Sequence, residues 1–142
     1  MTKYSQLKLE NQICFPLYAC AKGIVKKYTP ILEPFKLTYT QYIVMMVLWE
    51  QEQITVSDLG KRLFLDSGTL TPVLKKLELN GYVKRSRQSS DERCVAITLT
   101  DQGHLLQDNL KDVPQAVAGC VNLTAEEAAT LYSLLYKVLG CL

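Results

Sequence analysis

The feature that most restricts the fold is a pair of short helical patterns joined by a tight turn, over residues 55–81. The first helix begins at the Thr55–Asp58 segment, whose S/T-x-x-acid spacing is typical of a helix start. The turn at Asp66–Thr69 provides an N-cap, and a second helix is expected to begin at Ser67 and to end at Asn80–Gly81. The inward positions of that second helix are apolar: Leu70, Val73, Leu74 and Leu77.

Two alternating runs follow, residues 82–87 and 94–99, on either side of a polar segment. Such runs around a short loop predict a β-hairpin, and Ile54 is expected to form a bridge or a short strand. Two helices followed by a hairpin predict a winged helix-turn-helix, in which the second helix enters the major groove of DNA. We therefore expect a mainly α fold with a small β-hairpin wing (α+β). The whole chain, residues 1–142, forms one domain with a DNA-binding lobe over about 38–99.

The flanking segments, about 10–33 and 100–142, are expected to be dimerisation helices. Thr124 and Glu127 form a capping box for the last helix, which is apolar on more than one face. In the first segment, Pro16 either starts the regular helix or bends it, and Pro30 with Pro34 ends it. A small lobe cannot bury both segments, so they predict a homodimer. Its two recognition helices would lie about 34 Å apart on a palindromic double-stranded operator.

Composition and charge narrow the class of protein further. The chain has 48% hydrophobic and 21% charged residues, with neither a signal peptide nor a membrane-spanning run, so we expect a cytoplasmic protein without a membrane partner. The net charge of +2 hides a basic block at 75–87, with five Lys or Arg residues against Glu78 alone, and an acidic region at 100–136. The basic block suits a polyanion. Candidate DNA-contacting residues on the second helix and the hairpin are Ser67, Thr69, Thr71, Lys75, Lys76, Arg85, Arg87, Asp91 and Arg93.

The five cysteines and single histidine argue against most catalytic and metal sites. No Cys-x-x-Cys pair occurs, and His104 has no nearby cysteine. A structural metal, a cofactor and an enzymatic function are therefore not expected. Cys20 is expected to be structural, and Cys94 and Cys141 have no evident role.

The run Leu65–Glu78 and the segment Asp91–Arg93 resemble the recognition helix and the wing tip of the MarR family of bacterial transcriptional regulators. The resemblance covers essentially the whole chain. It implies that Asp91 buttresses Arg93, and that Arg93 contacts the minor groove.

The run Leu9–Phe15 is similar to the organic-hydroperoxide-sensing, OhrR-like branch of that family. The resemblance implies that Cys14 is the redox sensor and that Tyr28 and Tyr39 hydrogen-bond its sulfur across the dimer. Phenolic O–H donors stabilise a thiolate, which is the form that attacks a peroxide to give a sulfenic acid. The resemblance also implies that Cys120 of the other subunit is a resolving thiol.

Three alternatives remain open at this point. A MarR-type regulator gated by a small phenolic or lipophilic ligand leaves Cys14 incidental. A thiol peroxidase leaves the wing arginines unexplained, and a structural DNA-packaging protein does not explain Cys14 together with the two tyrosines. Apolar neighbours of Cys14 (Ile13, Phe15 and Leu17) favour lipophilic hydroperoxides over hydrogen peroxide as the signal.

Overall fold

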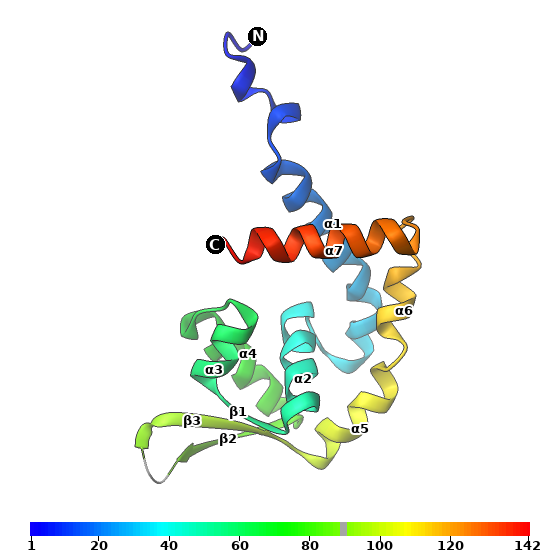
Figure 1. Ribbon diagram of the computed structural model, residues 1–142. Coiled ribbons are helices and arrows are strands. Elements are labelled where there is room, and N and C mark those ends of the chain that lie inside the picture. Colours follow the sequence, from blue (N-terminus) through cyan, green and yellow to red (C-terminus); the bar gives the residue numbers. More distant parts are fainter. Residues whose placement is uncertain (89–90) are drawn as a thin grey trace.

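The computed structural model describes the backbone of residues 1–88 and 91–142, and the side chains of residues 1–87 and 95–142. The described chain is mainly helical with one small sheet (Figure 1). Its α-helices are α1 (Cys14–Leu32), α2 (Tyr39–Gln51), α3 (Val56–Leu63), α4 (Ser67–Leu79), α5 (Asp101–Leu110), α6 (Val113–Ala118) and α7 (Ala125–Leu139). Short 3-10 turns occur at Ser5–Leu7, Leu9–Asn11 and Glu33–Phe35.

The helix-turn-helix unit is α3 and α4, as the sequence predicted. The Thr55 hydroxyl accepts from the backbone N–H of Asp58 and so caps α3. The Asp66 carboxylate accepts from the backbone N–H of Thr69 at 2.7 Å and caps α4, which begins at Ser67.

The sheet contains β1 (Gln53–Thr55), β2 (Val83–Gln88) and β3 (Asp91–Leu99) in the order β1-β3-β2. Both pairings are antiparallel, and Ile97 of β3 lies between Ile54 of β1 and Arg85 of β2. The predicted hairpin and the predicted short strand at Ile54 are therefore confirmed. The winged helix-turn-helix fold class is confirmed with them.

The core lies where α2 and α4 meet the sheet and α5. Its fully buried side chains include Leu48, Leu70, Leu77 and Ile97. The indole N–H of Trp49 donates to the carbonyl of Gly103 at 2.9 Å and ties α2 to α5. A Cβ at Gly103 would lie 2.2 Å from the backbone oxygen of Tyr82, so only glycine fits this close approach.

The prolines of helix α1 can now be compared with the prediction, which left open whether Pro16 starts or bends the helix. The helix begins at Cys14 with Pro16 in the first turn, where a proline removes no intrahelical hydrogen bond. Pro30 does not itself end the helix, because α1 continues past it to Leu32 and ends before Pro34, within the predicted segment 10–33. Leu32 is completely buried, and this packing outweighs the hydrogen bond that Pro30 removes.

The C-terminal part also divides differently from the prediction. A separate helix, α6, lies between α5 and α7, and Pro114 stands in its first turn. Helix α7 begins at the capping box of Thr124 and Glu127, as predicted. None of its residues is buried within the chain. Its exposed residues include large apolar side chains: Leu131, Tyr132, Leu134, Leu135, Tyr136 and Val138. None of the helices in the described part of the chain combines the length and apolar character needed to cross a bilayer.

Candidate sensor site and DNA-binding surface

Helix α4 exposes the polar face that the sequence assigned to DNA. Its candidate residues are all exposed: Ser67, Thr69, Thr71, Lys75 and Lys76. The opposite face is held in the core by Leu70, Leu74 and Leu77. The Thr69 and Thr71 hydroxyls donate within the first turn, to the Asp66 carboxylate and to the Ser67 carbonyl. Their oxygens can still accept, and the two lysines are cations of the kind that contact phosphates.

Arg85 is paired with an acidic side chain, unlike the exposed DNA-binding candidates on α4. Its Nε donates to the Glu78 carboxylate at 2.8 Å, and its backbone N–H donates to the same carboxylate at 3.1 Å. The guanidinium also makes an ion pair with Glu78 at 2.6 Å, and this pairing lowers the pKa of the Glu78 carboxyl. Arg85 thus joins the first strand of the wing to α4. This role was not predicted from the sequence, although Glu78 is the only acid in the basic block.

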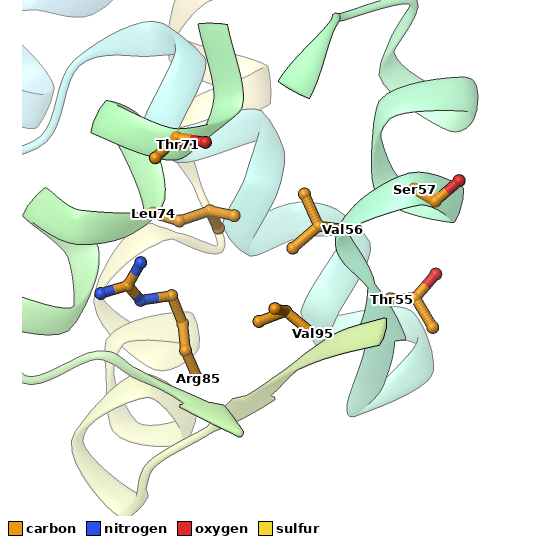
Figure 2. Close-up of a pocket in the computed structure, with 7 residues that line it drawn as sticks. All are labelled: Thr55, Val56, Ser57, Thr71, Leu74, Arg85 and Val95. Carbon is orange, nitrogen blue, oxygen red and sulfur yellow. The ribbon is translucent and has the colours of Figure 1, made fainter. Parts of the chain in front are cut away.

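A cavity of about 300 Å³ lies behind this ion pair, between the start of α3, helix α4 and the sheet. Figure 2 shows Arg85 reaching from β2 toward α4, with Leu74 and Thr71 above it and Val95 and Val56 on the other side. The Arg85–Glu78 pair therefore links the wing to the recognition helix. Arg87 is exposed on the same strand, whereas the side chains of Asp91 and Arg93 lie outside the described residues.

Cys14 is the first residue of α1 and is exposed within the single chain. Ile13 occupies the cap position and makes no side-chain hydrogen bond there, so the first backbone N–H groups of α1 have no side-chain partner. Such a helix start favours a negative charge beside it. The residues next to Cys14 in the sequence include three exposed apolar side chains, Ile13, Phe15 and Leu17.

Tyr28 and Tyr39 come together, as the assignment to one site requires. Their ring centroids are 4.8 Å apart, and Tyr42 completes the cluster at 5.7 Å from Tyr28. Burial raises the pKa of all three phenols, and neighbouring tyrosines add to this for Tyr28 and Tyr42. The three side chains therefore remain neutral O–H donors at physiological pH. Tyr42 was not predicted from the sequence, although it lies one turn after Tyr39 on α2.

Cys14 and the tyrosine cluster lie far apart in the same subunit. Fourteen residues of α1 separate Cys14 from Tyr28, which corresponds to about 21 Å along the helix. A thiol at one end of α1 cannot reach a phenol near the other end. If the two groups meet, the cysteine must come from another copy of the chain.

Cys120 follows α6 and is exposed, with its Sγ 3.6 Å from the carbonyl oxygen of Ala116. It lines a groove between α1 and α6, together with Cys20. Within the described residues, no group of three or more histidine, cysteine or acidic side chains is arranged to hold a metal ion.

Comparison with known proteins places the chain among transcriptional regulators. Residues 26–110 match the family model described as transcriptional regulator SarA/Rot. The organic hydroperoxide resistance transcriptional regulator of Bacillus subtilis is 44% identical over 140 residues, which cover 99% of this chain and 95% of that protein.

Solved structures of AbfR from Staphylococcus epidermidis are similar over nearly the full length. Reduced AbfR bound to DNA has a TM-score of 0.80 at 39% identity, and covers 98% of this chain and 97% of that one. Disulfide-formed AbfR has a TM-score of 0.69 at 38% identity, and covers 95% and 92%. The conformation described above is thus more similar to the DNA-bound reduced form than to the disulfide form.

Proposed function

Because the chain belongs to the SarA/Rot family of transcriptional regulators, in the organic hydroperoxide branch of the MarR family, we propose that it is a dimeric, DNA-binding repressor inactivated when an organic hydroperoxide oxidises Cys14. It acts as a stoichiometric sensor in the cytoplasm and not as an enzyme.

The separation of Cys14 from the tyrosine cluster is the observation that carries this proposal. Tyr28 and Tyr39 are half-buried, neutral donors, and Cys14 of their own subunit cannot reach them. Helices α1 and α7 both expose apolar faces that a second copy can cover. A dimer built on these faces supplies the partner's Cys14 to the cluster, which makes sensing a property of the dimer.

The chemistry at Cys14 follows from the groups around it. The thiolate attacks the distal oxygen of the hydroperoxide, the O–O bond breaks, and the products are a sulfenic acid and an alcohol after protonation. The two phenols donate hydrogen bonds to the thiolate before the attack. The thiol of Cys120 from the other subunit then displaces water from the sulfenic acid to form an intersubunit disulfide.

The DNA-binding lobe, residues about 38–99, positions α4 for the major groove and the wing beside it. Ser67, Thr69 and Thr71 supply short hydrogen-bonding groups, and Lys75, Lys76 and Arg87 supply cations. Asp91 and Arg93 are assigned to the minor groove. Arg85, being paired with Glu78, acts as a positioning residue for the wing. The segments 10–33 and 100–142 form the dimer and set the spacing of the two α4 helices on a palindromic operator.

The sensor pairing is tested by oxidising the purified dimer with cumene hydroperoxide and separating it on a non-reducing gel. A cross-linked dimer should form in the wild type and in a Cys141→Ser control. It should be absent from Cys14→Ser and from Cys120→Ser. A cross-link that persists in either of the last two variants contradicts the pairing.

A further inference from the structure

One groove of this fold contains two cysteines of the same subunit. Helix α1 contributes Cys20, Gly23, Ile24 and Lys27, which are spaced at i, i+3, i+4 and i+7 and so form one stripe. The α6 side contributes Val117, Cys120 and Val121. Neither Cys20 nor Cys120 is in a disulfide, and both are exposed.

The direction of the two helices places the thiols at the same end of the groove. In Figure 1, α1 descends from the N-terminus, whereas α6 rises toward α7. Cys20 lies in the first half of α1, and Cys120 lies just beyond the last residue of α6. Both residues line the groove, and the opposite directions of the helices bring the first half of α1 and the C-terminal end of α6 to the same end of it.

The groove that both cysteines line is open. The groove has a volume of about 340 Å³, and a Cβ built at Gly23, one turn from Cys20, meets no atom within 4 Å. Helices packed about 8–10 Å apart bring facing Cα atoms to roughly 3.4–5.4 Å, since each Cα lies about 2.3 Å from its axis. The upper half of that interval lies within the roughly 4.4–6.8 Å that a disulfide spans.

We propose that Cys20 and Cys120 of one subunit are a disulfide-forming pair, and that Cys20 converts the intersubunit disulfide into an intrasubunit one. This replaces the structural role expected for Cys20 from the sequence. The conversion step rests on the proposed function, whereas the pairing of the two thiols does not.

The conversion is a thiol–disulfide exchange and needs no additional oxidant. The Cys20 thiolate attacks the sulfur of Cys120, forming the Cys20–Cys120 bond, while the bond from Cys120 to the partner's Cys14 breaks. Cys14 leaves as a thiolate and takes up a proton. The electrons of the intersubunit disulfide are therefore conserved, the cross-link between subunits is released, and Cys14 returns to its reduced state.

The pairing is tested first without the sensor. A Cys14→Ser/Cys94→Ser/Cys141→Ser protein keeps Cys20 and Cys120 alone and is treated with diamide, which oxidises two thiols to a disulfide. The expected result is loss of both free thiols, monomer mobility on a non-reducing gel, and a peptide that joins Cys20 to Cys120. Thiols that still react with maleimide, or a link that joins two subunits, would overturn the pairing.

The exchange is tested by following the cumene hydroperoxide reaction over time in wild type, Cys20→Ser and a Cys141→Ser control. The cross-linked dimer should decline several-fold in wild type and in the control, while the Cys20–Cys120 peptide accumulates. It should persist in Cys20→Ser. A wild-type cross-link as lasting as that of Cys20→Ser overturns the exchange. If no variant forms a cross-link while the diamide test succeeds, the sensor pairing fails and the Cys20–Cys120 pair stands.

Discussion

At the scale of single residues, the proposed function divides one reaction between two subunits, with the two tyrosines on one and Cys14 on the other. Tyr28 and Tyr39 contact each other on α1 and α2, and burial raises the pKa of both phenols. A neutral phenol donates a hydrogen bond to an anionic sulfur, whereas a phenolate would repel it. The cluster is therefore suited to a thiolate that arrives from outside the chain.

Replacing Tyr28 or Tyr39 by Phe should slow the oxidation of Cys14 while leaving DNA affinity unchanged. A hydrogen bond to a charged group contributes about 1.5–3 kcal/mol, so removing each hydroxyl is expected to reduce the rate about tenfold or more. The rate is measured by stopped-flow mixing with cumene hydroperoxide. Tyr42→Phe serves as the control from the same cluster, and an equal loss in that variant would contradict the assignment of the two donors.

The raised tyrosine pKa values also predict an alkaline loss of stability. Since folding raises the pKa of Tyr28 and Tyr39 above the ordinary 10.0, the native state holds these protons more tightly than the unfolded state. This contribution is fully present below pH 10 and is lost as pH rises through the native values. As pH rises above about 10, the free energy of unfolding should fall more steeply in wild type than in Tyr28→Phe/Tyr39→Phe. Parallel curves from urea denaturation would show that the two phenols are not buried as described.

At the scale of elements, α4 and the wing form one unit because Arg85 and Glu78 join them. The described part of β2 presents Arg87 outward, and α4 presents Lys75 and Lys76 beside the short hydroxyls. Positioning of the wing and binding of DNA are thus assigned to different side chains of the same basic block.

Lys75→Ala should weaken binding to all DNA sequences to a similar extent and should reduce its dependence on salt. The slope of log K against log salt concentration falls by about 0.9 for each phosphate that the protein no longer neutralises. Fluorescence anisotropy over a salt series measures this slope. Lys111→Ala, in the acidic half of the chain, removes the same charge and should leave the slope unchanged. Equal effects of the two variants would mean that net charge alone, and not α4, determines binding.

Helix starts were predictable from the sequence because capping is local. Thr55, Asp66 and Thr124 each accept a hydrogen bond from a backbone N–H three residues later. The motifs identified Thr55 and Thr124, and they placed a cap in the turn that contains Asp66. The continuation of α1 past Pro30 depends on the buried Leu32, which is a tertiary effect. The Arg85–Glu78 pair likewise depends on where the wing folds. Helix α6 had a local signal, Pro114 in its first turn, from which it could have been predicted.

At the scale of the whole molecule, the single chain is incomplete. Helix α7 buries none of its residues, and its apolar arc leaves one polar face that includes Ser133 and Lys137. The groove between α1 and α6 is lined by Cys20 and by Cys120, the residue proposed to form a disulfide with the partner's Cys14. Dimerisation, sensing and DNA spacing therefore depend on the same helices.

Leu135→Glu should dissociate the dimer and abolish operator binding, because Leu135 lies at the centre of the apolar arc of α7. A buried charge without a partner costs about 3–5 kcal/mol, which weakens dimerisation at least about 100-fold. Sedimentation velocity measures the oligomeric state, and Ser133→Glu, on the polar face, should remain dimeric. A Leu135→Glu protein that stays dimeric would exclude α7 from the interface.

The role of Cys14 as the sensor is tested most directly by measuring the binding of wild type and Cys14→Ser to a palindromic A·T-rich operator, before and after one equivalent of cumene hydroperoxide. Both proteins should bind with the same affinity before oxidation. After oxidation, the wild type should dissociate and Cys14→Ser should remain bound. If both proteins dissociate, or if both stay on the DNA, then Cys14 is not the sensor.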